Sequence, residues 1–124
     1  MTVIRHTEAR RTETPGGVMT TLASPSQGGA PISVWHVEVA AHATGPVHAI
    51  DADQIWTVLG GHLRIELDGT DLVAAAGDTV VLPAERTRQI HGGTEGFTAI
   101  VAGSPHAKAS TPTSGDAVTP PWIV

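Results

Sequence analysis

The 124-residue sequence is divided by turn-forming residues at short intervals. Turn signals, among them Gly-Pro, Gly-Gly and Asp-Gly pairs, recur about every 8–12 residues, a spacing typical of proteins built from many short strands. No stretch longer than about ten residues keeps the 3.6-residue periodicity of an amphipathic helix. The sequence therefore predicts an all-β fold of the sandwich or barrel type.

Residues 32–39 carry the clearest strand pattern. Trp35, Val37 and Val39 share one face, while His36 and Glu38 lie on the other, as expected for a strand with one buried side. Shorter segments with a similar signal are residues 18–22, 63–67, 71–74, 79–82 and 97–102. These segments are sufficient for one small barrel.

Glycine pairs and the two ends of the chain suggest how the strands are connected. Gly60-Gly61 predicts a tight connection between two strands, and Asp68-Gly69 predicts a β-hairpin. Residues 1–11 are interpreted as a loose arm. Residues 104–124 are rich in Ser, Thr, Pro and Gly, a composition typical of disorder, but the closing Trp122-Ile123-Val124 predicts that the tip docks on an apolar groove of this barrel or of a neighbour.

Composition excludes several classes of function. The net charge of −5, with seven basic residues that are not clustered, argues against nucleic-acid and membrane partners. The chain has no cysteine, which excludes disulfides, thiolate chemistry and Cys-built zinc sites. Without an apolar signal or a run of about 18 apolar residues, we expect a cytoplasmic location.

Two glycine-containing motifs give the chain a family resemblance. The first contains Gly45, His48 and Gly61, and the second contains Gly77-Asp78 and Pro83. Their order and spacing resemble the two motifs of the cupins, a resemblance that covers roughly residues 32–103. It implies a double-stranded β-helix, or jelly roll, flanked by an N-terminal arm and short strand at residues 1–31 and a tail at residues 104–124.

The four metal-ligand positions of the cupin motifs are occupied here by His48, Ile50, Gln54 and Arg88. Only one of these side chains is an imidazole, and a guanidinium is a permanent cation that repels a metal ion. We therefore expect no metal cofactor. If a divalent metal is bound, the resemblance leaves His48 and Gln54 as its ligands.

The same positions predict a binding pocket for a small molecule. Trp35 and Trp56 would supply flat apolar walls, Arg88 a donor for an anion, Gln54 a hydrogen bond, and His48 a group that titrates near neutral pH. The remaining residues expected on the cavity face are Ile50, Ile90, Thr98 and Ile100. The set suits a planar anionic or aromatic ligand.

Three functions remain open. In a metal-independent isomerase, dehydratase or cyclase, His48 and Arg88 would be the catalytic residues. In a non-catalytic binding module, the same pocket would hold a ligand unchanged, and a metal-dependent oxygenase or lyase is the third hypothesis. A purely structural alternative is that the tryptophans fill the barrel and Arg88 pairs with Asp51 or Asp53. We also expect a homodimer, since single-domain cupins commonly pair through their sheets.

Overall fold

The computed structural model describes residues 1–124 and consists mainly of β-strands, which confirms the predicted all-β class. The elements in chain order are η1 (His6–Glu8), β1 (Arg10–Thr14), β2 (Gly17–Ala23), β3 (Ser33–Val39), β4 (Ala49–Ile50), β5 (Gln54–Leu67), β6 (Thr70–Ala75), β7 (Thr79–Leu82), β8 (Arg88–His91), β9 (Phe97–Gly103), β10 (Ala109–Thr111), β11 (Ser114–Val118) and η2 (Pro121–Ile123). Neither short 3-10 helix has the length and hydropathy that a membrane-spanning helix requires.

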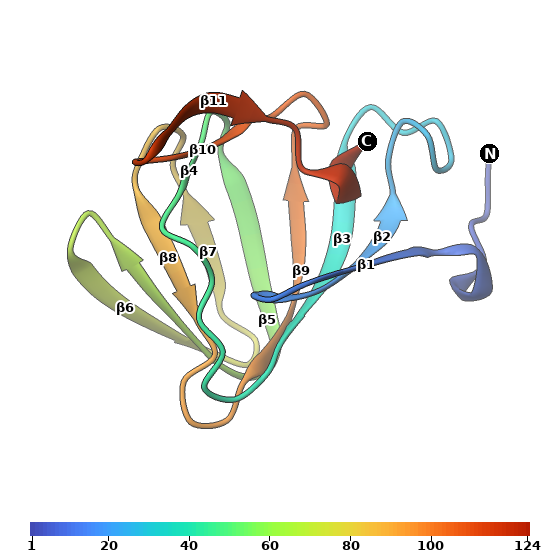
Figure 1. Ribbon diagram of the computed structural model, residues 1–124. Coiled ribbons are helices and arrows are strands. Elements are labelled where there is room, and N and C mark those ends of the chain that lie inside the picture. The colour runs from blue at the N-terminus through green and yellow to red at the C-terminus, as the bar shows by residue number, and fades with distance from the viewer.

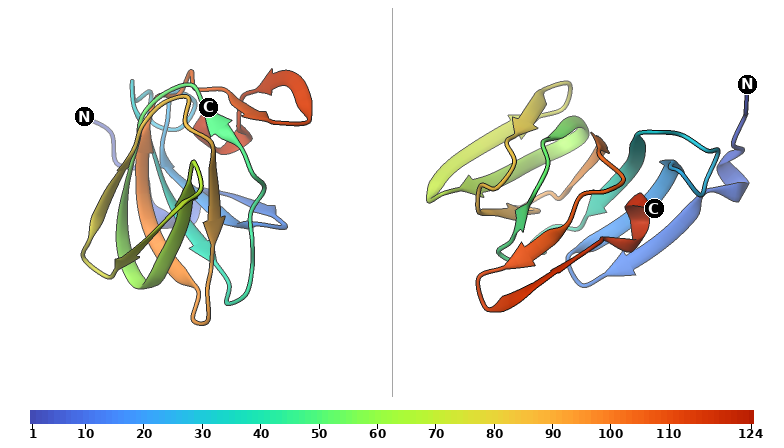
Figure 2. Two further views of the ribbon diagram at one scale, coloured as in Figure 1. Left: turned by 90° about the vertical axis from the view of Figure 1, so that its left-hand side faces the viewer. Right: turned by 90° about the horizontal axis from the view of Figure 1, so that it is seen from above.

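The strands form one curled eight-stranded sheet and a small three-stranded sheet. In the large sheet the order is β1-β2-β3-β9-β5-β6, and β7 and β8 also pair with β5. The small sheet has the order β11-β10-β4. Figures 1 and 2 show the large sheet curling around an interior, with the β10–β11 hairpin crossing one end of it. The jelly-roll architecture predicted from the two motifs is confirmed.

Strand β5 is a single bent strand of 14 residues, so the predicted connection at Gly60-Gly61 is wrong. Its first half pairs with β7 and β9, and its second half pairs with β6 and β8. At the bend, the register with β9 shifts between Val58 and Gly60, and Gly61 has a φ of 72°. A Cβ atom on Gly61 would lie 2.1 Å from the carbonyl oxygen of Gly96. Glycine is needed here because the bend combines a positive φ with a close backbone approach.

Alternate residues of the central strands build the core. Trp35 of β3 and Trp56 of β5 both pair with Val101 of β9. Directly paired residues share a face of the sheet, so these three buried side chains point into the barrel. Leu63 and Ile65 in the second half of β5 are 0% and 1% exposed, which confirms the face predicted from their alternation.

A hairpin that follows β5 and a strand that precedes β2 complete the large sheet. The predicted Asp68-Gly69 hairpin is present, and both residues have a positive φ (48° and 81°), as a type I′ turn requires. The loose arm predicted for residues 1–11 is too long, because β1 begins at Arg10 and pairs with β2. The sheet therefore gains a strand that the sequence pattern did not indicate.

The last residues of the chain dock on the chain's own barrel, which agrees with one of the two predicted alternatives. Ile123 is 1% exposed, and η2 contacts β1, β2 and β3. Thr21 Oγ1 donates a hydrogen bond of 2.7 Å to the carbonyl oxygen of Trp122, and Ser33 Oγ donates to that of Ile123. Hydroxyl groups of the barrel thus donate hydrogen bonds to carbonyl oxygens that a Pro- and Ser-rich tail cannot pair within itself.

Candidate functional site

A cavity of about 390 Å³ lies between the interior face of the barrel and residues 109–122. Its volume falls within the range of about 300–1,000 Å³ that is common for small-molecule sites. Barrel side chains form one part of the wall, and β10, β11 and η2 form the other. The lining residues with the largest barrel side chains are Met19, Trp35, Val37, Val39, His48, Ile50, Gln54, Trp56 and Ile90.

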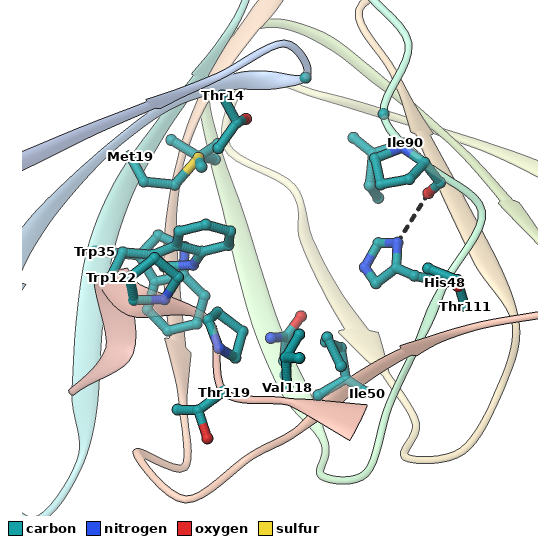
Figure 3. A pocket seen from close by; sticks show the side chains of 18 of the residues that line it. Thr14, Met19, Trp35, His48, Ile50, Ile90, Thr111, Val118, Thr119 and Trp122 are labelled. Atoms are coloured by element: carbon teal, nitrogen blue, oxygen red, sulfur yellow. Dashed lines mark hydrogen bonds between the residues drawn. The ribbon is translucent and has the colours of Figure 1, made fainter. Parts of the chain in front are cut away.

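All three tryptophans of the chain line this cavity. Figure 3 shows Trp35 and Trp122 on one side of the cavity and His48 on the opposite side. Trp56 packs against Phe97 behind the wall, with the ring centroids 6.4 Å apart and the planes tilted by 51°. The cavity therefore offers the flat apolar surfaces on which a ring can stack.

Gln54 lines the cavity in a fixed orientation. It lies two residues before Trp56 on β5, so both side chains share the interior face. Trp56 Nε1–H donates to Gln54 Oε1 at 3.2 Å. An indole N–H can only donate, so the amide oxygen is the atom that faces Trp56. The amide NH₂ group has no partner within the chain.

His48 lines the cavity just before β4 and is held by the backbone. Its main chain pairs with that of Arg88, and its Nδ1 lies 2.9 Å from the carbonyl oxygen of Pro46. Burial lowers the pKa of His48 below its ordinary value of 6.5, and the nearby Arg88 cation lowers it further, although the bond to Pro46 opposes both effects. His48 is therefore mainly neutral near pH 7, with Nδ1–H donating to Pro46 and the lone pair on Nε2.

Arg88 does not line the cavity, contrary to the expectation from the sequence. The side chain is 1% exposed, and its Nη2 donates to the carbonyl oxygens of Pro83 (2.7 Å) and Arg86 (3.2 Å). Its Nη1 is buried without a partner. Burial lowers the pKa of Arg88, while Asp53 and Asp68 raise it. Neither carboxylate forms an ion pair with it, so the alternative of an Asp51 or Asp53 pair is also not observed.

Thr98 and Ile100 were expected on the cavity face, and the structure places them on the opposite face. The buried residues of β9 are Phe97, Ala99 and Val101, and the alternating Thr98 and Ile100 are half-buried on the outside. Segment 97–102 is apolar on both faces, so alternation alone could not choose between them. The pairing of Val101 with the interior tryptophans decides the face.

Several cavity residues were not singled out from the sequence. Met19 of β2 reaches the cavity from the strand predicted at residues 18–22, and Trp122 of η2 reaches it from the predicted tail. Asp116 of β11 also lines it. The one available signal was the aromatic residue at the end of a polar tail. The cavity wall is therefore assembled from a larger part of the chain than the two motifs.

The side chains at the four cupin ligand positions do not fit a divalent metal ion. Ile50 has no lone pair, Arg88 can only donate, and the oxygen of Gln54 uses one of its two lone pairs to accept from Trp56. His48 Nε2 and one neutral amide oxygen are then the only donor atoms at these positions, fewer than a divalent metal site requires. No cluster of three His, Cys, Asp or Glu side chains suited to a metal occurs anywhere in the chain.

Comparison with known proteins supports the fold. No family model and no curated protein match the sequence. Among solved structures, KdgF from Halomonas sp. is similar with a TM-score of 0.70 and 22% identity, covering 86% of this chain and 94% of that chain. An RmlC-like cupin from Shewanella frigidimarina is similar with a TM-score of 0.70 and 20% identity, covering 83% and 89%. This chain has the fold of an RmlC-like cupin.

A longer protein contains a similar unit as one part of its chain. Salicylate 1,2-dioxygenase from Pseudoaminobacter salicylatoxidans, in a structure with gentisate, has a TM-score of 0.71 and 14% identity to this chain. The match covers 85% of this chain and 31% of the dioxygenase. At these identities the comparisons establish the cupin fold, and the chemistry has to be argued from the cavity itself.

Proposed function

We propose that this cupin binds a small, flat, largely apolar molecule in the barrel cavity and that His48 exchanges a proton with it. The observation that carries the proposal is the cavity wall, which all three tryptophans of the chain line and in which Trp35 and Trp122 lie opposite a neutral histidine, His48. The gentisate complex of salicylate 1,2-dioxygenase provides one precedent for a small aromatic molecule on this fold. Trp35, Gln54, Trp56, Ile50 and Ile90 are the barrel residues that we assign to ligand binding.

The reaction that fits this wall best is an isomerisation. His48 and Asp116 are the only ionisable side chains that line the cavity, and Asp116 is exposed on β11. A single base can remove a proton from one atom of a substrate and return it to another, whereas dehydration and cyclisation usually need a separate acid. Arg88 has its guanidinium on the carbonyls of Pro83 and Arg86, so we assign it a structural role.

A test of catalysis needs a ligand and a base-free variant. A compound that raises the melting temperature of the protein is incubated with it in D₂O, and deuterium incorporation at carbon is followed by NMR. We expect wild-type protein to accelerate the exchange and His48→Gln to abolish the acceleration while its Kd rises by no more than about ten-fold, because the base and one hydrogen bond are lost and the cavity remains. Equal exchange rates with the two proteins would contradict a role for His48.

The non-catalytic binding module is the second candidate, and one observation favours it. The cavity wall contains no second acid or base beside His48 apart from the exposed Asp116. If the ligand binds in the cavity and shows neither turnover nor exchange, this candidate replaces the first. The metal-dependent alternative is tested by elemental analysis of protein purified without a polyhistidine tag, for which we expect no stoichiometric metal.

A homodimer and a cytoplasmic location remain predictions. The outer face of the sheet supports dimerisation, because Ile55 of β5 and Val81 of β7 are directly paired there and are 48% and 61% exposed. Leu59 of the same strand β5 is 52% exposed. Exposed apolar side chains on a flat sheet favour an interface. Sedimentation velocity tests this directly, with Val81→Lys as the variant expected to be monomeric.

A further inference from the structure

Gln54 and His48 present opposite hydrogen-bonding groups to the cavity, and each group is fixed by a neighbour. Gln54 Oε1 accepts the indole N–H of Trp56, so turning the amide over would place an NH₂ group against another donor. Gln54 is 7% exposed, and its Nε2 has no partner within the chain. The Gln54 Nε2 group is therefore a hydrogen-bond donor available to a ligand in the cavity.

His48 Nε2 is a hydrogen-bond acceptor available to a ligand in the cavity. The carbonyl oxygen of Pro46 can only accept, so it fixes the proton of the neutral imidazole on Nδ1. The lone pair is then on Nε2, which has no partner within the chain. Figure 3 shows the ring between the contact with this carbonyl and the cavity, opposite Trp35 and Trp122.

The charges around the cavity disfavour an anionic ligand. None of its lining residues is a lysine or an arginine, and Asp116 is the one carboxylate among them. Arg88, the cation that the sequence suggested as an anion anchor, donates to the carbonyls of Pro83 and Arg86. An anion in the cavity would lose its hydration without gaining a cationic partner.

From these groups we infer that the ligand is an uncharged, flat molecule that bears an acceptor oxygen for Gln54 Nε2 and an O–H or N–H donor for His48 Nε2. A hydroxyaryl ketone is a simple member of this class. The inference rests on the proposed function and adds the polarity of the ligand to it. The two polar groups select ligands because a ring without matching substituents would leave both of them desolvated and unpaired.

The test is a series of soluble one-ring probes that share a shape and differ in their polar groups. 3-Hydroxyacetophenone and 4-hydroxyacetophenone carry both groups, acetophenone carries the acceptor, 4-ethylphenol carries the donor, ethylbenzene carries neither, and 4-hydroxybenzoate is an anion. The ¹H–¹⁵N signals of the three indole groups report binding, because all three tryptophans line the cavity. We expect each matched group to tighten binding by about three- to ten-fold, the usual net gain of a hydrogen bond.

Two variants assign the acceptor preference to Gln54. Gln54→Met keeps the length of the side chain and removes the amide, so acetophenone should lose its advantage over ethylbenzene. Thr98→Val, on the outer face of the barrel, should retain it. If Gln54→Met does not fold, the probe series on wild-type protein still decides the inference, because the order of probe affinities is measured without any substitution.

The outcomes separate this inference from the proposal on which it rests. Equal affinities of all uncharged probes, or tightest binding of 4-hydroxybenzoate, would overturn the inference and leave a small-molecule site in place. If no probe, ethylbenzene included, shifts an indole signal, the proposed function fails and the inference with it. Tightest binding of a hydroxyacetophenone supports both.

Discussion

Replacement of Ile123 by alanine tests whether residues 109–122 are a stable wall of the cavity. Ile123 is 1% exposed, and it anchors η2 between β1, β2 and β3. The substitution removes three carbon atoms, which at about 0.8 kcal/mol each amounts to roughly 2.4 kcal/mol of lost transfer free energy. The void left behind adds to this loss, so we expect the free energy of unfolding to fall by about 3–4 kcal/mol.

The assay is urea denaturation followed by tryptophan fluorescence, which has no tyrosine background in this chain. Val124→Ala is the matched control, because that side chain is 44% exposed and should cost less than about 0.5 kcal/mol. If the segment detaches before the barrel unfolds, the emission of Trp122 shifts to the red at lower urea than the main transition. A change below about 0.5 kcal/mol for Ile123→Ala, with an unaltered emission spectrum, would refute the reasoning.

Three further predictions concern the bend, the histidine and the arginine. Gly61→Ala should cost about 1–3 kcal/mol more than Gly69→Ala by thermal denaturation, since both have a positive φ but only Gly61 faces a carbonyl at 2.1 Å; equal losses would exclude the steric cause. Because burial lowers the folded-state pKa of His48 below 6.5, its neutral form contributes stability above that pH that is lost on acidification, and His48→Gln should flatten the decline between about pH 7 and 5. An unchanged slope would show that other groups cause the decline. Arg88→Met should change the Kd of 4-hydroxyacetophenone less than two-fold, since Arg88 does not line the cavity; a ten-fold loss would restore it as a ligand contact.

The faces of the central strands could be predicted from the sequence because their patterns are unambiguous. In β3 and the second half of β5, large apolar residues alternate with polar ones, and the motif positions His48, Ile50 and Gln54 line the cavity as expected. In β9 both faces are apolar, so the interior position of Val101 and the outer position of Ile100 depend on pairing with distant strands. Alternation carries no information about such pairing.

Two other features also lay beyond the sequence pattern. Arg88 is on the interior face, as the resemblance implied, but the direction of its guanidinium is set by the carbonyls of Pro83 and Arg86 in the preceding turn. The tail has the composition of a disordered segment. It is held by hydroxyl groups of Thr21 and Ser33, which lie about 90–100 residues earlier and meet it only in the folded barrel.

The most direct test of the central claim maps where a ligand binds. Uniformly ¹⁵N-labelled protein is titrated with 4-hydroxyacetophenone while the indole and backbone amide signals are recorded. Binding in the cavity predicts that the indole signals of Trp35, Trp56 and Trp122 shift together with one Kd, while the amides of Ile55 and Val81 on the outer face remain in place. Unmoved indole signals, or shifts confined to the outer face, would contradict the assignment of the cavity as the functional site.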